Sequence, residues 1–235
     1  MCTTIVNGVL VNTVQVPAHE EISVTETALG SSTTPSRFRT PDATDLARVA
    51  VFAAIVVVLG LPGGFTVFGG VPITAQTLGV MLAGAVLGPW LGALSMGVVL
   101  ILTAAGLPLL AGGRGGIGVF LGPSAGYALG FVLGAIVIGL IVHAGGRKPV
   151  IWRTAIGMVV GGIVAIYALG IPIQSLVTGL PLGETALTSL VFVPGDLIKA
   201  AIATIVVSTL LRAYPRAFRR VWAPKRAESD TLPLP

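Results

Sequence analysis

The fold of this protein is decided by the apolar run Leu187–Leu211, which reads LTSLVFVPGDLIKAAIATIVVSTLL. A helix of this length can cross the hydrocarbon core of a bilayer. Asp196 and Lys199 are the only charged residues in the run. A charge at membrane depth costs at least about 2.5 to 3.5 kcal/mol on insertion scales, so such residues usually have a function. Because they are three positions apart, they share one helix face and can pair with each other or with a polar ligand. A purely structural ion pair is the alternative.

The composition of the whole chain is that of an integral membrane protein. Of its 235 residues, 54% are hydrophobic and 10% are charged, whereas a soluble domain has roughly 25% charged residues. The mean hydropathy is +0.96. Cys2 is the single cysteine, and neither His19 nor His143 has a second histidine at ligand spacing. We therefore expect no metal site and no cofactor.

Long apolar windows interrupted by Gly, Pro or charge predict the membrane spans. The predicted fold class is an all-α integral membrane protein, a six-transmembrane-helix bundle covering 44–211. Residues 1–43 lack helical periodicity and are expected to form a disordered cytoplasmic extension, and 212–235 a basic cytoplasmic tail. The six predicted spans lie at about 44–61, 72–88, 90–106, 124–144, 150–171 and 187–211.

The distribution of basic residues predicts the orientation of the bundle. Lys and Arg gather before the first span, around the fourth loop and after the last span, whereas the first, third and fifth loops contain only Arg114 and Glu184 as charged residues. Because Lys and Arg are in excess on the cytoplasmic side, both termini are expected to be cytoplasmic. The net charge of +5 reflects this topology, and nucleic acid is not an expected partner.

The predicted topology places six polar residues in the outer half of the bundle, while the inner half is almost wholly apolar. This asymmetry is typical of an outward-facing pocket rather than a continuous pore. Two alternatives stay open: the residues that start the second span can simply satisfy the backbone there, and the arginine can be a solvated loop charge. The candidate binding residues are Thr74, Gln76, Arg114, Tyr127, Asp196 and Lys199.

The third loop contains the segment Leu107–Gly116, LPLLAGGRGG, which is too rich in glycine for a helix and too apolar for an ordinary exposed loop. Such backbone is tolerated near a membrane where protein covers it or where it lines a cavity. We therefore predict a Gly-rich outer loop that forms a re-entrant or lid-like cover over the pocket. A mobile linker is the alternative.

Small residues recur on two predicted helix faces. Gly126, Gly130 and Gly134 are spaced by four in the fourth span, a pattern that is repeated by Gly157 and Gly161 in the fifth and that indicates close helix packing. In the first span, a face of small residues suits either internal packing or docking of another membrane helix. It consists of Ala43, Ala47, Ala50 and Ala54.

Several short strings, taken in their order and spacing over roughly 44–211, resemble the BioY family of biotin-binding capture (S) subunits of energy-coupling factor (ECF) transporters. The tails lie outside this resemblance. The strings are VPITAQTL at 71–78, GPWLGA at 88–93, GLP at 106–108, AGGRGG at 111–116, LGPSAGY at 121–127, GF at 130–131 and VPGDLIKA at 193–200.

The resemblance implies a non-enzymatic subunit for biotin uptake in the bacterial cytoplasmic membrane. Asp196 would accept the ureido N–H bonds of biotin, and Lys199 or Gln76 would donate to a ligand oxygen. Arg114 is the candidate for the biotin carboxylate, and Tyr127 would pack against the ring system, with Thr74 nearby. The division of roles between the lysine and the arginine stays open.

The resemblance also implies partners. The chain has no nucleotide-binding motif, so it would work with a transmembrane coupling subunit and two ATPase subunits, docking through Ala50 and Ala54. Whether such partners are required stays open. An ion-coupled or solitary secondary transporter of a small carboxylate-bearing solute is the main alternative, but no inverted repeat is visible in the sequence. A membrane enzyme is the other, but we find no complete catalytic set.

Overall fold

The protein is represented by a computed structural model that describes residues 2–6, 9–13, 42–62, 65–66, 71–144 and 149–218. The chain divides into two units, Met1–Thr40 and Pro41–Pro235. Each unit is considered by itself.

In the first unit, strands β1 (Cys2–Val6) and β2 (Val9–Thr13) form an antiparallel pair in which Val6 is opposite Val9. The sequence predicts no regular structure here, so the structure differs from that expectation. Both strands are rich in β-branched residues, and the intervening sequence Asn7-Gly8 is favoured in two-residue hairpin loops. The rest of the predicted extension, up to residue 41, lies outside the described residues.

The second unit is almost entirely helical in its described part, as the sequence predicts. Each of the predicted apolar windows contains a helix. Two additional short strands, β3 (Phe65–Thr66) and β4 (Pro72–Ile73), pair antiparallel before the second window. The helices are α1 (Ala43–Gly60), α2 (Gln76–Leu87), α3 (Pro89–Ala104), α4 (Ala125–Val142), α5 (Ile151–Val159), α6 (Ile166–Thr178), α7 (Leu182–Ser189) and α8 (Val193–Ala213).

Shorter turns of helix join several of these elements. A π-helical turn, η3 (Val160–Ala165), joins α5 to α6, and a 3₁₀ turn, η4 (Leu190–Phe192), joins α7 to α8. Further 3₁₀ turns are η1 (Ile117–Leu121) and η5 (Pro215–Phe218). The helical segments of the fifth and sixth windows are therefore continuous over Ile151–Thr178 and Leu182–Ala213. Both extend into the segment between the two windows, which the sequence predicts to be a loop.

Within the described residues, four helical segments are long and apolar enough to cross a membrane: Ala43–Gly60, Ala125–Val142, Ile151–Thr178 and Leu182–Ala213. The helices Gln76–Leu87 and Pro89–Ala104 are equally apolar but shorter. The helical fold class is thus confirmed, whereas the count of six spans stays a prediction.

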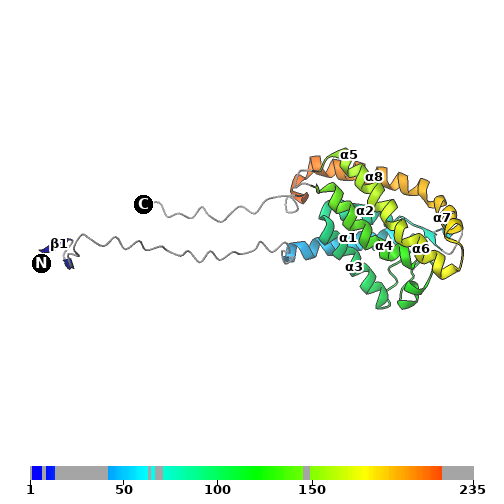
Figure 1. Cartoon of the computed structure of the whole chain (residues 1–235), viewed down its shortest axis with the longest axis horizontal. Helices are drawn as coiled ribbons and strands as arrows, with labels where there is room; N and C mark the ends of the chain where they lie inside the picture. The colour runs from blue at the N-terminus through cyan, green and yellow to red at the C-terminus, as the bar shows by residue number, and fades with distance from the viewer. Residues whose placement is uncertain are drawn as a thin grey trace, which may run out of the picture. The chain divides into compact units, whose positions relative to one another are not determined.

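Helix α4 is the centre of the bundle and packs against α2, α3, α5 and α6 (Figure 1). Its glycine face permits this, because a Cβ at Gly130 would lie 3.0 Å from the carbonyl oxygen of Ile166, and one at Gly161 would lie 2.9 Å from that of Gly134. These backbone contacts confirm that the regularly spaced glycines of the fourth and fifth windows mediate helix packing.

The second window begins as a helix later than predicted. The sequence predicts that Pro72 occupies the first turn, but this residue lies in β4 and α2 begins at Gln76. The hydroxyl of Thr74 accepts a hydrogen bond from the backbone N–H of Gln76 at 3.2 Å. A short polar side chain of this kind satisfies an N–H group that the helix itself leaves without a partner. Thr74 therefore has the backbone role that the sequence left open beside ligand binding.

The ends of the helical unit follow the predicted arrangement in part. In Figure 1, α1 begins and α8 ends at the same end of the unit, and α7 lies at the opposite end. Several of the basic residues that indicate the orientation, including Arg37, Arg39, Arg147 and Lys148, lie outside the described residues. The cytoplasmic placement of both termini therefore stays a prediction.

Candidate functional site

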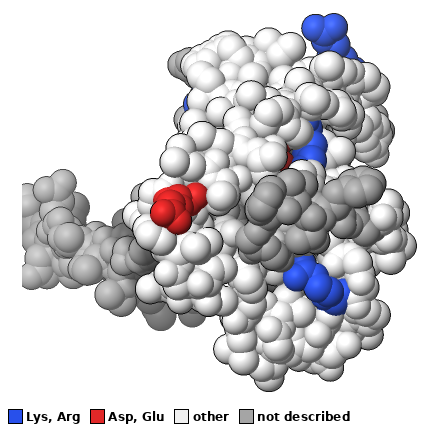
Figure 2. All heavy atoms as spheres, turned by 90° about the vertical axis from the view of Figure 1, so that its right-hand side faces the viewer, with Lys and Arg blue, Asp and Glu red and all other residues white. Residues whose placement is uncertain are grey.

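A pocket opens between β4 and helices α2, α4, α6 and α8, and we call it the Asp196 hollow. It contains about 440 Å³ of space free of protein atoms, including the part open to the outside, within the range of about 300–1,000 Å³ typical of ligand pockets. Its walls are mostly apolar, with Phe131, Ile166 and Phe192 among them, and its polar groups include Asp196 and Lys199. On the face shown in Figure 2, charged side chains are few, and a basic side chain beside an acidic one is recessed among neutral ones.

Asp196 is placed by the start of α8. The sequence predicts one helix from Leu187 onward with the aspartate well inside it, but the 3₁₀ turn η4 interrupts the segment and α8 begins at Val193. Pro194 lacks an N–H group and suits the first turn of a new helix. Asp196 therefore lies in the first turn of α8, where the helix dipole favours a negative charge.

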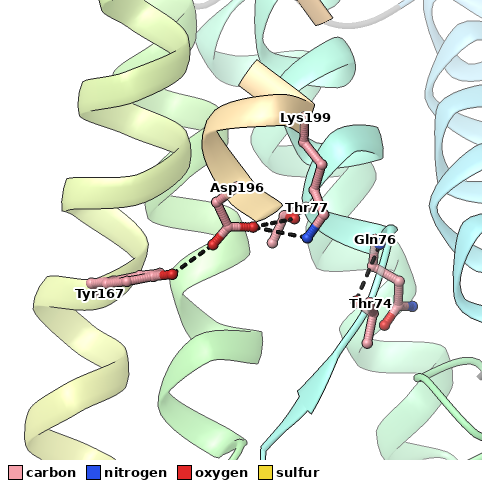
Figure 3. A network of polar contacts seen from close by, with 6 residues as sticks. All are labelled: Thr74, Gln76, Thr77, Tyr167, Asp196 and Lys199. Carbon is pink, nitrogen blue, oxygen red and sulfur yellow. Dashed lines mark hydrogen bonds and ion pairs between the residues drawn. The ribbon is translucent and has the colours of Figure 1, made fainter. Parts of the chain in front are cut away.

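The carboxylate of Asp196 is the centre of a buried hydrogen-bond network (Figure 3). Its Oδ1 accepts from Lys199 Nζ at 2.8 Å and from Thr77 Oγ1 at 3.3 Å. Its Oδ2 accepts from the hydroxyl of Tyr167 at 2.6 Å. The residue is only 4% exposed, so this charge is compensated by three hydrogen-bond donors, one of which is the cation Lys199, rather than by water.

A second pocket, the Arg114 hollow, lies directly beside the first. It contains about 340 Å³ of space free of protein atoms and includes Gln76, Ala111, Arg114 and Ser124 in its wall. The two hollows share five lining residues and are therefore neighbours along one continuous surface. The shared residues are Val71, Pro72, Thr74, Tyr127 and Phe131.

The Gly-rich loop forms one wall of the Arg114 hollow. Leu110 and Arg114 exchange two backbone hydrogen bonds of 3.1 Å, and Gly112 and Gly113 turn the chain between them with φ of 73° and 71°. Such positive φ angles favour glycine. Leu110 and Ala111 are buried and line the hollow. The loop therefore lines a cavity, as the sequence predicts, and the reading of this segment as a plain linker is wrong.

Arg114 is held at the edge of this hollow. Its Nε donates to the carbonyl oxygen of Ala111 at 3.1 Å, and one terminal nitrogen donates to Ser124 Oγ at 3.1 Å. These bonds engage two of the five N–H groups of a guanidinium. Burial lowers the pKa of the Arg114 guanidinium from its usual value, but an arginine stays charged at neutral pH. The structure therefore offers a fixed cation with donors to spare.

Gln76 is buried, but its amide is already engaged by the backbone. Nε2 donates to the carbonyl oxygens of Val56 at 3.4 Å and Leu109 at 3.1 Å, and Oε1 accepts from the N–H of Ala111 at 3.2 Å. Both amide hydrogens thus have protein partners. The observed role of Gln76 is to tie α1 and the Gly-rich loop to the start of α2, which was one of the two roles left open by the sequence.

Tyr127 contributes its ring to both hollows while its hydroxyl points elsewhere. The hydroxyl is hydrogen-bonded to Gln174 Oε1 and Ser189 Oγ, each at 2.9 Å. The ring makes an edge-on contact with Tyr167, with 5.9 Å between the centroids. The structure therefore leaves the aromatic face, rather than the hydroxyl, available to the hollows.

All six candidate binding residues come together in these two hollows. Asp196 and Lys199 line the first, Gln76 and Arg114 line the second, and the remaining two line both. The sequence analysis missed Tyr167 and Thr77, which complete the coordination of the aspartate. A tyrosine in the middle of an apolar window, in a chain with only three tyrosines, was the available signal.

The small-residue face of α1 lies on the outside of the bundle. Ala43, Ala47, Ala50 and Ala54 are exposed, whereas Val49, Ala53 and Val56 are buried on the opposite side of the helix. Internal packing, one of the two roles considered for this face, is therefore wrong. Docking of a partner helix stays a prediction.

Comparisons with known proteins agree with this arrangement. Residues 30–216 match the model of the BioY family. The chain is 47% identical over 178 residues to the biotin transporter BioY of Rhodobacter capsulatus, a match that covers 72% of this chain and 94% of that protein. It is 46% identical over 170 residues to the probable biotin transporter BioY of Bacillus subtilis, covering 72% and 91%.

The fold also matches a solved structure. The crystal structure of the S-component for biotin from an ECF-type ABC transporter superposes with a TM-score of 0.69 at 33% identity, covering 75% of this chain and 96% of that one. Since the family model spans most of the chain and the relatives are matched almost end to end, this protein belongs to the BioY family.

Proposed function

We propose that this chain is the biotin-binding S-component of an ECF-type transporter, which captures biotin outside the cell for delivery to the cytoplasm. The observation that carries the proposal is a pair of adjoining hollows, one ending in a neutral polar cluster around Asp196 and the other in the cation Arg114. The relatives from Rhodobacter capsulatus and Bacillus subtilis, which are named as biotin transporters, support it.

The polar cluster suits the ureido ring of biotin. Because Asp196 and Lys199 form an ion pair of 2.8 Å, the cluster as a whole is close to neutral, and a neutral polar group can bind there without bringing a new charge into an apolar site. A cyclic urea presents two N–H donors and one carbonyl acceptor. The carboxylate of Asp196 supplies acceptors and the ammonium of Lys199 supplies donors.

The Arg114 hollow suits the carboxylate of biotin, and the apolar walls between the hollows suit its thiophane ring and valeryl chain. A guanidinium binds a carboxylate with charge-assisted hydrogen bonds. We expect Arg114→Gln to weaken biotin binding by roughly 10-fold or more, but to leave the affinity for biotinamide, which has no carboxylate, nearly unchanged. Arg114→Lys, which keeps the charge, should recover part of the loss. Equal losses for biotin and biotinamide in Arg114→Gln would place the carboxylate elsewhere.

The ring of Tyr127 is expected to form the shared wall against which the ligand packs. A Cβ at Gly170 would lie 2.7 Å from Cζ of this ring and closer still to two other ring carbons. Because the ring is buried, Gly170→Ala should push it toward the hollows, destabilise the fold by about 1–3 kcal/mol and weaken biotin binding. Gly183→Ala is the matched control, because its Cβ would meet no atom within 4 Å. Binding assays and thermal unfolding of both variants check this, and equal behaviour would contradict it.

The apolar helices support a place in the bacterial cytoplasmic membrane. We propose that all six helical segments cross it, with the shorter α2 and α3 spanning as part of the bundle, and that both termini are cytoplasmic. The two hollows then face the outside. Cysteine substitutions on either side, labelled by a membrane-impermeant reagent in intact cells, test this orientation: residues in the Gly-rich loop should react and residues beyond Ala213 should not.

ATP hydrolysis is assigned to partner subunits, a transmembrane coupling protein and two ATPases, since the chain itself has no nucleotide-binding motif. Uptake of labelled biotin by cells expressing the chain with these partners tests the transport role. Uptake should persist with an uncoupler while ATP is maintained, and it should stop when ATP is depleted. Collapse with the uncoupler at constant ATP would instead favour a secondary transporter.

A further inference from the structure

A third hollow, which we call the glycine hollow, adjoins the Arg114 hollow. It contains about 700 Å³ of space free of protein atoms, including the part open to the outside, which is more than either of the other two. Arg114 and Ser124 line both it and the Arg114 hollow, and they are joined by a hydrogen bond of 3.1 Å. This pair therefore marks the border at which the two hollows meet. The other lining residues are Gly113, Gly115, Gly118, Val119 and Gly122.

The glycine hollow is open because side chains are missing from its wall. A Cβ at Gly118 would meet no atom within 4 Å, and one at Gly122 would come no closer than 3.6 Å to its nearest neighbour. The φ of Gly118 also lies outside the left-handed region, so its backbone conformation does not require glycine. Neither a turn nor a close approach therefore depends on Gly118, and its observed effect is to leave this space free.

The glycine hollow begins where the proposed ligand ends. In the proposed function, Arg114 holds the carboxylate of biotin, so any group attached through that carboxyl starts at the border with the glycine hollow. The volumes of both hollows include space open to the outside. A flexible tail can therefore run from one hollow into the other without entering the packed interior of the bundle.

The charge of the glycine hollow favours an anionic tail. Among the described residues that line it, Arg114 is the one with a charge. Its guanidinium uses two of its five N–H groups on Ala111 and Ser124, and it attracts a negative group nearby and repels a positive one. Val119 and the Cα atoms of the glycines supply apolar surface for methylene groups.

We infer that the glycine hollow is an extension subsite for biotin amides, in which biotin is joined through its carboxyl group to an aliphatic tail that ends in a carboxylate. The amide of biotin with the side chain of lysine belongs to this class. The inference rests on the proposed function and extends its substrate class from free biotin to these conjugates. The biotin part occupies the two hollows already described, and the tail lies beyond Arg114.

Three ligands test the inference on the purified full-length chain: biotin, biotinamide and biotinylaminohexanoate. The last two both lack the carboxylate of biotin and differ in the tail, so their comparison isolates what the tail contributes. Affinities are measured by calorimetry. We expect the wild type to bind biotinylaminohexanoate roughly 3- to 10-fold more tightly than biotinamide. Equal or weaker binding of biotinylaminohexanoate would overturn the inference.

Gly118→Trp fills the glycine hollow and should remove this preference, while the affinities for biotin and biotinamide change by less than about 2-fold. Gly183→Trp is the matched control, because its Cβ also meets no atom within 4 Å and Gly183 lines none of the three hollows. It should bind all three ligands like the wild type. Gly118→Leu should act in the same direction as Gly118→Trp with less added bulk.

Each variant is checked for a monodisperse profile before its affinities are compared. An unchanged preference for biotinylaminohexanoate in both variants of Gly118, or an equal loss of affinity for all three ligands in them, would overturn the extension subsite. Failure of the wild type to bind biotin and biotinamide would instead overturn the proposed function, and this inference with it.

Discussion

Replacement of Asp196 by Asn is expected to reduce the affinity for biotin by at least about 100-fold while the chain stays folded. The carboxylate accepts hydrogen bonds on both oxygens, from Lys199, Thr77 and Tyr167. An amide has one acceptor oxygen and one donor nitrogen, so it cannot satisfy donors on both sides. It also leaves the ammonium of Lys199 without its counter-ion in a largely buried site, and breaking such a pair costs about 3–5 kcal/mol.

Asp45→Asn provides a control with the same chemical change. Asp45 is also buried, at 6% exposure, but it caps the start of α1 and does not line either hollow. We expect this variant to bind labelled biotin with wild-type affinity. Unchanged affinity in a monodisperse Asp196→Asn sample would remove Asp196 from the binding site.

The second large effect is expected at the partner surface. Replacing both Ala50 and Ala54 by Trp should abolish assembly with the transmembrane coupling subunit while leaving biotin affinity intact. Both alanines are exposed on α1, away from the residues that line the hollows. Small residues let two membrane helices approach until their backbones are close, and two indole rings would prevent that approach.

Copurification of the tagged chain with its partners measures this effect, and a biotin-binding assay on the same preparation reports the integrity of the site. Ile202→Trp combined with Ile205→Trp is the control, since both residues are exposed on α8 and the variant presents the same two indole rings on another helix. We expect assembly to survive in the control. Assembly that survives in the alanine double variant would show that docking uses another surface.

The helices and the central ion pair could be predicted from the sequence, because both depend on local patterns. Each apolar window contains a helix, although α7 lies mostly in the segment between the last two windows that was predicted as a loop. The spacing of three residues between Asp196 and Lys199 predicted the contact that is observed at 2.8 Å. The interruption of the last window could not be read from hydropathy, since η4 is as apolar as the helices it joins. It depends on how the backbone hydrogen bonds restart near Pro194.

The partners of individual polar side chains were harder to predict, because they come from distant parts of the chain. For Gln76 the sequence left open a ligand-donor role and a backbone role, and it could not show that its amide binds backbone groups of Val56, Leu109 and Ala111. Tyr167 is the second residue of α6, which follows the π-helical turn η3 directly. One extra residue per turn changes the direction of every later side chain in the helix, so its position beside Asp196 could not be derived from a period of 3.6.

The most direct test of the proposed function is equilibrium binding of labelled biotin to the purified chain alone in detergent, with unlabelled biotin and thiamine as competitors. We predict saturable binding that unlabelled biotin displaces and thiamine does not, because the adjoining hollows combine a neutral cluster at Asp196 with a cation at Arg114. The absence of saturable binding by a well-folded sample, or equal displacement by thiamine, would contradict the proposal that this chain is a biotin-capture subunit.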